Sequence, residues 1–285
     1  MGTITVGVDR SVGAVAALHW AAREAELRSW TVTAVLAWGF FDQQHSVVGR
    51  QFDPSYGETD ALAALDEIVD GARGTEPTVP VFRRVVYGQA GPVLTEASAS
   101  SDLLVVGTRG LGAFRSLLLG SVSQACLHHA SCAVAIVGAP VDPSPATGRV
   151  VVGIDGSAAS RRALGWALDE ARLRHAPVDV VHAWPSPYSY AYPYAAPIID
   201  PEIYRKAAEE VLDDALEAQD LTGLPGPITR ITAEGGPARI ILERSVGADL
   251  VVVGGRGLGG FTGLLIGSVT HQVAHHSRCP VVVIP

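Results

Sequence analysis

The chain repeats itself, and this internal duplication limits most strongly how it can fold. Val6-Gly-Val-Asp9 recurs 146 residues later as Val152-Gly-Ile-Asp155. Further along, Gly107-Thr-Arg-Gly-Leu-Gly112 matches Gly254-Gly-Arg-Gly-Leu-Gly259 at an offset of 147 residues. A repeat of this length has the size of a whole domain. The 285 residues therefore predict two domains of one fold, residues 1–139 and 149–285, joined by a proline-rich linker at 140–148.

Each copy alternates short apolar runs with segments of helical periodicity. In the second copy we predict strands at 149–154, 178–183, 228–233, 250–253 and 280–284, and helices at 157–175, 202–218, 238–246 and 267–276. Continuous apolar strands separated by helices indicate a parallel sheet that is covered on both faces. The sequence therefore predicts an α/β protein made of two tandem Rossmann-like domains.

Composition excludes several classes of function. The formal net charge of -8 argues against nucleic acid as a partner, because phosphate binding needs clustered basic residues. Lys206 is the only lysine and lies on a predicted helix surface, which excludes a Walker A loop and a protein kinase. The three cysteines are too few for a disulfide scaffold. With no signal peptide and no long apolar run, we expect a cytoplasmic protein without membrane contact.

A glycine-rich segment follows the fourth predicted strand of each copy. Gly255, Gly257 and Gly260 satisfy the dinucleotide fingerprint G-x-G-x-x-G, but that motif belongs after a first strand. The first copy also has Thr108 where the second has Gly255. The pattern that both copies share is Gly-x2-Gly-x9-Gly-Ser, at positions 107, 110, 120 and 121 and again at 254, 257, 267 and 268.

The Gly-Ser pair of this pattern lies where a helix is predicted to begin. Free N–H groups, the positive end of the helix dipole and a hydroxyl meet there, which favours an anion site. Serine is also a common N-cap, so a structural role stays open. Asp9 and Asp155 end the first strand of each copy. If strands one and four are neighbours, each aspartate faces its glycine loop across a ligand crevice at the switch point.

These motifs resemble those of the ATP-binding universal stress proteins, and the chain is similar over nearly its full length to tandem actinobacterial members of that family. Gly153-Ile-Asp-Gly-Ser157 matches the Gly-x-Asp-Gly-Ser of the family, and both glycine loops match its loop after strand four. The resemblance implies an adenine nucleotide alpha hydrolase-like fold with strand order 3-2-1-4-5, and ATP with Mg2+ in each domain. The implied site residues are Gly7, Asp9, Ala37, Gly107, Gly110, Gly120, Ser121 and Val122 in the first copy, and Gly153, Asp155, Ala183, Gly254, Gly257, Gly267, Ser268 and Val269 in the second.

By this resemblance, the aspartates and the backbone at Ala37 and Ala183 contact the nucleoside, and the Gly-Ser-Val segments hold the phosphates. The first copy departs from the family at Arg10, where glycine is usual, and at Ala14, opposite Ser160. Arg10 could hold phosphate or obstruct the first site. Arg109 and Arg256 recur in both copies and either clamp phosphate or form structural ion pairs.

No residue near these motifs is suited to serve as a general base or to position water, so we expect ATP binding with little or no turnover. A slow ATPase and a nucleotide-independent interaction module are the alternatives. His275-His276-x-x-Cys279 and its counterpart ending at Cys132 suggest metal ligands, but they close helices and are better explained as structural. We expect the apolar strand-five edges, 133–137 and 281–284, to pair as an intrachain pseudo-dimer or in a homodimer. A regulatory protein partner is expected but not identified.

Overall fold

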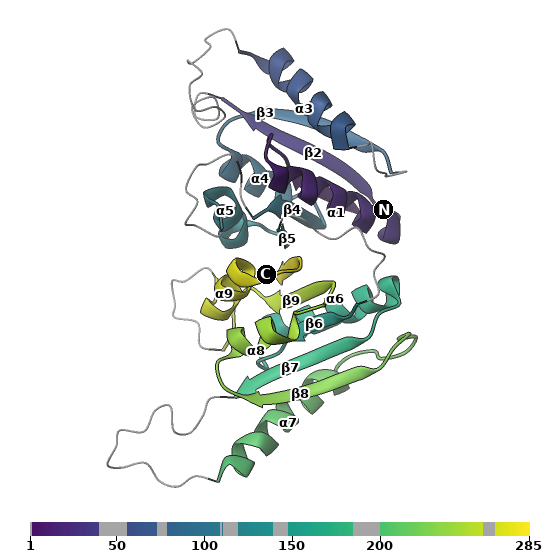
Figure 1. Cartoon of the computed structure of the whole chain (residues 1–285), viewed down its shortest axis with the longest axis vertical. Helices are drawn as coiled ribbons and strands as arrows, with labels where there is room; N and C mark the ends of the chain where they lie inside the picture. Colours follow the sequence, from purple (N-terminus) through teal and green to yellow (C-terminus); the bar gives the residue numbers. More distant parts are fainter. Residues whose placement is uncertain are drawn as a thin grey trace, which may run out of the picture. The chain divides into compact units, whose positions relative to one another are not determined.

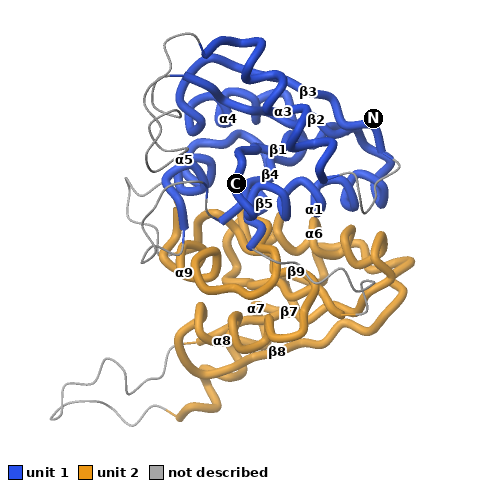
Figure 2. The backbone as a smooth tube through the Cα atoms, turned by 45° about the horizontal axis from the view of Figure 1, so that its top comes forward, with its two compact units in different colours: residues 1–143, 285 blue, residues 144–284 orange. Residues whose placement is uncertain are grey.

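The computed structural model describes residues 2–39, 56–72, 79–108, 110, 119–138, 148–184, 200–258 and 266–285. The chain divides into two compact units, shown in Figure 2. Unit 1 comprises residues 1–143 with Pro285, and unit 2 comprises residues 144–284. Each unit holds one copy of the sequence repeat. The linker predicted at 140–148 lies almost wholly outside the described residues and stays a prediction.

Unit 1 is built on a sheet of five parallel strands in the order β3-β2-β1-β4-β5 (Figure 1). The strands are β1 Thr3–Gly7, β2 Thr31–Trp38, β3 Val81–Tyr87, β4 Leu103–Gly107 and β5 Ala133–Val137. The helices are α1 Val12–Arg28, α3 Glu58–Ala72, α4 Ala90–Ser98 and α5 Ser121–His129. The strands form from the apolar runs, and β5 is buried along its whole length.

Unit 2 repeats this arrangement, with its strands in the order β8-β7-β6-β9-β10. The strands are β6 Val150–Gly153, β7 Val178–Trp184, β8 Ile228–Glu234, β9 Leu250–Gly254 and β10 Val281–Ile284. The helices are α6 Ala158–Arg174, α7 Pro201–Glu217, α8 Pro237–Arg244 and α9 Ser268–His276. The predicted fold class is confirmed in both units, and the predicted elements of this copy end within one or two residues of the observed ones.

Helices cover both faces of each sheet. In unit 1, α1 contacts α3 and α4 contacts α5, which gives one helical layer on each face. Small side chains on α1, among them Ala17 and Ala21, are fully buried and let that helix approach β1 and β4 closely. The strands between the layers carry large, fully buried side chains such as Ile4, Leu104 and Leu250. This packing holds the strand ends in fixed positions.

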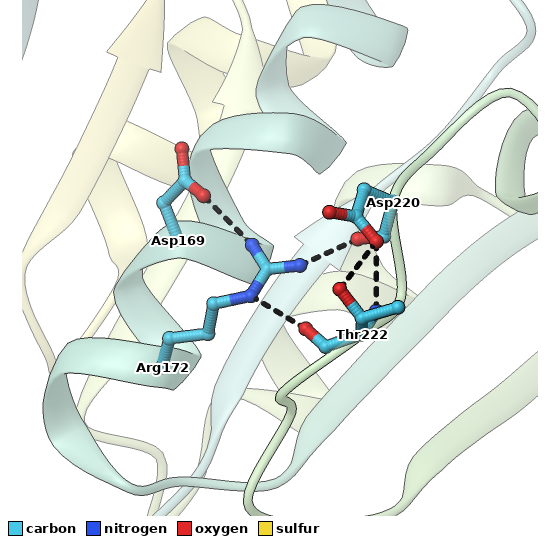
Figure 3. A network of polar contacts seen from close by, with 4 residues as sticks. All are labelled: Asp169, Arg172, Asp220 and Thr222. Carbon is cyan, nitrogen blue, oxygen red and sulfur yellow. Dashed lines mark hydrogen bonds and ion pairs between the residues drawn. The ribbon is translucent and has the colours of Figure 1, made fainter.

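One arginine fastens the end of α6 to the segment that follows α7 (Figure 3). The Arg172 guanidinium donates to the backbone oxygens of Asp220 and Thr222 and pairs with the Asp169 carboxylate at 2.8 Å. The Asp220 carboxylate in turn accepts from the backbone N–H and the hydroxyl of Thr222, at 2.9 and 2.7 Å. Arg172 therefore satisfies backbone carbonyls of an exposed turn at the end of α6 opposite its first turn.

Strand order places the expected site. In unit 1, β1 lies between β2 and β4, so the connection after β1 runs to one side of it while β4 is added on the other side, and the same holds for β6 between β7 and β9 in unit 2. The carboxyl ends of β1 and β4, or of β6 and β9, therefore form the switch point where open parallel sheets bind ligands. We call the residues that follow these two strands in each unit its switch-point site.

Candidate functional site

In unit 2 the Asp155 carboxylate holds the two loops of the switch-point site together. Its Oδ1 accepts from the Ser157 N–H at 3.0 Å, within its own loop. Its Oδ2 accepts from the Leu258 N–H at 3.0 Å, in the glycine loop after β9. A second link joins the same loops, because the Ser157 hydroxyl donates to the Arg256 oxygen at 3.4 Å. The sequence-predicted aspartate and glycine loop are therefore in direct contact.

Packing within the protein requires glycine at both positions of the Gly-x-x-Gly pair, because a Cβ at either one would clash with a neighbouring segment. A Cβ on Gly254 would lie 2.9 Å from the Ala159 carbonyl carbon and the Ser160 nitrogen, at the start of α6. A Cβ on Gly257 would lie 2.2 Å from the Asp155 Oδ2. The first glycine thus lets α6 pack on the end of β9, and the second lets the carboxylate reach the loop. The atoms that approach these two glycines closely belong to the protein and not to a ligand.

The helix that follows each glycine loop begins without a side-chain cap. The N-caps are Gly120 for α5 and Gly267 for α9, and neither helix has a side-chain hydrogen bond at its cap. Ser121 and Ser268 are exposed in the first turn of their helices, so the explanation of these serines as N-caps is wrong. Among the described residues no side chain caps the N–H groups of this first turn, and they lie next to an exposed hydroxyl, which suits an anion.

The position of each helix start is fixed by two further bonds in both units. The Gly267 N–H donates to the Gly255 oxygen at 2.8 Å, and the Gly120 N–H donates to the Thr108 oxygen at 2.8 Å. The hydroxyls of Thr270 and Ser123 donate to the oxygens of Gly254 and Gly107, each at 2.7 Å. Sequence reasoning missed these hydroxyls, although a hydroxyl residue stands two positions after the Gly-Ser serine in both copies.

Unit 1 builds the same site with fewer described contacts. The Asp9 Oδ1 accepts from the Ser11 N–H at 2.9 Å, and a Cβ on Gly110 would lie 2.5 Å from its Oδ2. Ala14 stands where unit 2 has Ser160, whose hydroxyl accepts from the Asp155 N–H at 3.3 Å. Ala14 offers no hydroxyl for such a bond. The departure that the sequence indicated at Ala14 therefore removes one polar contact from the first site.

The other predicted site residues lie around these two loops. Gly7 and Gly153 end β1 and β6, and a Cβ there would meet Leu94 at 2.5 Å or Ile241 at 2.6 Å, from the helices beneath. Ala37 and Ala183 lie near the carboxyl ends of the neighbouring strands β2 and β7. Val122 and Val269 are half-buried in the first turns of α5 and α9.

Of the two recurring arginines, only Arg256 lies within the described residues. Arg109 lies outside the described residues, and its predicted role stays a prediction. Arg256 is exposed and forms no ion pair with any acid in the described part of the chain. Of the two roles that the sequence left open for Arg256, the structural ion pair is therefore absent within the described ranges.

The His-His-x-x-Cys segments have the chemistry of packed helix ends. Burial raises the pKa of the Cys126 thiol to about 12 and that of Cys132 to about 11, and it raises the pKa of Cys279 as well. Thiols of this kind stay protonated at neutral pH and are poor metal ligands. Burial, with His271 and His276 nearby, lowers the pKa of His275. No three His, Cys, Asp or Glu side chains among the described residues are placed to hold a metal ion.

The protonation of Asp155 should control how firmly the glycine loop is held. Burial alone would raise its pKa, but hydrogen bonds from Ser157, Ser160 and the Leu258 N–H together lower it below the usual 3.8. Because the folded-state pKa is depressed, the stabilisation is present above the unfolded-state value and is lost as pH falls through the folded-state pKa. We expect Asp155→Asn to destabilise unit 2 by about 1 kcal/mol at neutral pH.

Urea unfolding of wild type and Asp155→Asn at several pH values measures this effect. The difference in unfolding free energy should stay constant between about pH 7 and pH 5 and shrink below about pH 4, as first the carboxylate of the unfolded chain and then that of the folded protein becomes protonated. A difference that persists unchanged in strong acid would show that the charge of Asp155 is not what holds the loop.

Taken together, the fold and the site define a tandem, doubly wound α/β protein with an aspartate against a glycine loop at each switch point. The chain belongs to the universal stress protein family: the family model described as "Universal stress protein family" matches residues 1–138 and 147–285. The family that the sequence motifs indicated is confirmed.

Known relatives support this assignment along nearly the whole chain. Universal stress protein Rv2623 of Mycobacterium tuberculosis is 38% identical over 292 residues, which cover 98% of this chain and 95% of that protein. A universal stress protein of Mycolicibacterium smegmatis is 34% identical over 295 residues, with 99% and 96% covered. The crystal structure of a universal stress protein from Archaeoglobus fulgidus covers 99% of this chain and 97% of its own, with a TM-score of 0.64 and 19% identity, and so shares its fold. Within the described residues, no helix is long and apolar enough to cross a membrane.

Proposed function

We propose that the chain binds ATP with Mg2+ at the switch-point site of each unit and acts as a nucleotide-dependent regulator in a stress response. The observation that carries the proposal is the uncapped start of α5 and α9, each directly joined to a glycine loop that contacts an aspartate. A helix start that suits an anion and a carboxylate that contacts the same glycine loop suit a ligand with a phosphate end and a hydroxyl-bearing end. A nucleotide is such a ligand.

In this proposal each element of the site would hold a different part of the nucleotide. The N–H groups and hydroxyls at Ser121 and Ser268 would hold phosphate oxygens, and Mg2+ would bridge those oxygens. The exposed Arg256 guanidinium lies on the loop between the two ends and would neutralise phosphate charge. Asp9 and Asp155 would accept hydrogen bonds from the nucleoside, as the acidic residue of dinucleotide sites does from ribose.

The environment of Asp155 supports binding with little or no turnover. Both of its carboxylate oxygens already accept backbone N–H groups, and these bonds lower its pKa. A carboxylate held in this way is a weak general base and serves to position the loop. Nucleotide occupancy would then act by favouring one arrangement of the glycine loop, which a partner or a second chain could recognise. Pairing of the strand-five edges, within the chain or in a homodimer, belongs to the same proposal.

Analysis of co-purified small molecules, followed by calorimetry with Mg-ATP, tests the proposal. We expect adenine nucleotide to be released when the purified chain is gently denatured, and micromolar affinity for added Mg-ATP. Asp155→Ala should weaken binding at unit 2 by about tenfold or more, because it removes the hydrogen bonds of a charged group.

Asp214→Ala is the matched control, because Asp214 is an exposed aspartate on α7 outside the switch-point site. It should leave both nucleotide sites unchanged. Absence of bound nucleotide together with absence of a calorimetric signal would contradict the proposal and favour a nucleotide-independent interaction module. Phosphate release above the level of an Asp9→Ala, Asp155→Ala double variant would favour the slow ATPase.

A further inference from the structure

The two switch-point sites differ in charge at the residue directly after the aspartate. Unit 1 has Arg10 there and unit 2 has Gly156. Building on the proposed nucleotide binding, we propose that Arg10 makes the unit 1 site selective for a nucleotide that carries a phosphate on its ribose, whereas the unit 2 site takes nucleotides without one. The two repeats would then be receptors for two chemically different nucleotides.

The contacts of Gly156 locate this position at the edge of the site. A Cβ on Gly156 would lie 3.6 Å from the Val211 Cγ1 on α7 and 4.0 Å from the Leu258 Cδ1 on the glycine loop. The Leu258 N–H is the group that binds the Asp155 carboxylate. Gly156 has a left-handed backbone with φ +85° that Arg10 does not share, so these contacts locate the edge of the site, and the Arg10 side chain is placed by its own ion pair.

The ion pair of Arg10 shows on which side of the aspartate its guanidinium lies in this structure. Its Nη2 is 3.9 Å from the Glu67 Oε2 on α3, and α3 packs against β2 and β3. The phosphate-binding start of α5 follows β4, on the other side of β1. A nucleotide with its 5′-phosphates at α5 would extend toward Asp9 and present its ribose hydroxyls between Asp9 and Arg10.

The guanidinium is available for such a ligand. The Arg10 side chain is 49% exposed and that of Glu67 is 77% exposed, and the pair is at the long limit of an ion pair. Exposed pairs of this kind hold a side chain weakly. Guanidinium binds phosphate through two parallel hydrogen bonds, which a single long contact to glutamate does not match.

An aspartate and an arginine at a ribose discriminate between two chemical states of that ribose. In dinucleotide sites the acidic residue binds a free ribose hydroxyl, and a nearby arginine accommodates a ribose phosphate. Asp155 with Gly156 supplies only the first group. Asp9 with Arg10 supplies both, and Arg10 offsets the repulsion that a ribose phosphate would meet at the Asp9 carboxylate. The charge difference between the repeats thus makes unit 1 selective for a ribose phosphate and leaves unit 2 without that selectivity.

Calorimetry with two ligands of equal phosphate number tests this inference. The ligands are adenosine 5′-diphosphate and adenosine 3′,5′-bisphosphate, which differ in where the second phosphate sits. The full chain is used with unit 2 impaired by Asp155→Ala or with unit 1 impaired by Asp9→Ala. We expect the bisphosphate to bind unit 1 about tenfold more tightly than the diphosphate, and unit 2 to show no such preference.

Arg10→Gln in the Asp155→Ala chain should abolish the preference, because it weakens binding of the bisphosphate about tenfold and that of the diphosphate by much less. Arg10→Lys should retain part of the preference for the bisphosphate, because lysine keeps the positive charge but cannot make the two parallel hydrogen bonds of a guanidinium. Thermal unfolding checks that these exposed substitutions leave the fold intact. Equal preference in the two units, or an equal effect of Arg10→Gln on both ligands, would overturn the inference while leaving nucleotide binding standing. Failure of both ligands and of ATP to bind the wild-type chain would overturn the proposed function and this inference with it.

Discussion

Replacing Gly254 with valine is expected to lower the free energy of unfolding of unit 2 by about 3 kcal/mol or more. Gly254 is the last residue of β9 and lies against the first turn of α6. A Cβ there would approach the Ala159 carbonyl carbon and the Ser160 nitrogen at 2.9 Å, closer than real Cβ contacts. These are backbone atoms, so relief requires α6 to shift as a whole.

Such a shift would also disrupt the switch-point site. The first turn of α6 contains Ser160, whose N–H donates to the Ser157 hydroxyl at 3.1 Å, and Ser157 donates to Asp155. We therefore expect Gly254→Val to lose nucleotide binding at unit 2 together with stability. Urea unfolding followed by circular dichroism measures the first effect, and calorimetry measures the second.

Gly236→Ser is the matched control in the same unit. Gly236 is the N-cap of α8 with φ −70°, and a Cβ on it would meet no atom within 4 Å. Serine is favoured at an N-cap, so this variant should be neutral or slightly stabilising. Gly107→Val should reproduce the large effect in unit 1, where a Cβ would lie 2.8 Å from the Gly13 carbonyl group. Wild-type stability of Gly254→Val would show that the close contact between α6 and β9 is not rigid.

The fold could be predicted from the sequence because most strands other than β3 and β8 are buried on both faces. Segments such as Leu250–Gly254 contain no polar side chain, and they alternate with helices long enough to show their periodicity. The duplication gave a second view of each element. Helix ends were less certain, since Ser157 was predicted as helical and is the N-cap of α6.

The candidate site was predicted in its composition and only partly in its geometry. Asp155 and the glycine loop were expected to face each other across a ligand, whereas Asp155 binds the loop directly through Leu258. Gly254 was assigned to a ligand, and its close neighbour is α6. A glycine that admits a helix and one that admits a nucleotide look alike in sequence. Both kinds of position lack space for a Cβ. Only the three-dimensional structure shows whether a helix or a ligand occupies that space.

A second large effect is expected at Glu170, whose side chain is fully buried. Its Oε1 accepts from the Arg174 Nε at 3.1 Å, and the Arg174 side chain is only 9% exposed. Helical spacing places Glu170 on the same face as Ala163 and Ala167, both of which are buried. Removing one partner of a buried ion pair leaves an uncompensated charge. We therefore expect Glu170→Ala to destabilise unit 2 by about 3–5 kcal/mol.

Urea unfolding with the exposed pair Arg239 and Glu243 as control isolates the role of burial. That pair has the same spacing of four residues and a distance of 2.7 Å, but its side chains are 64% and 59% exposed. Glu243→Ala should cost no more than about 0.5 kcal/mol. The double variant Glu170→Leu, Arg174→Met should recover much of the stability lost in Glu170→Ala, because it removes both charges from the interior. Equal losses in Glu170→Ala and Glu243→Ala would contradict a dominant cost of the unpaired buried charge.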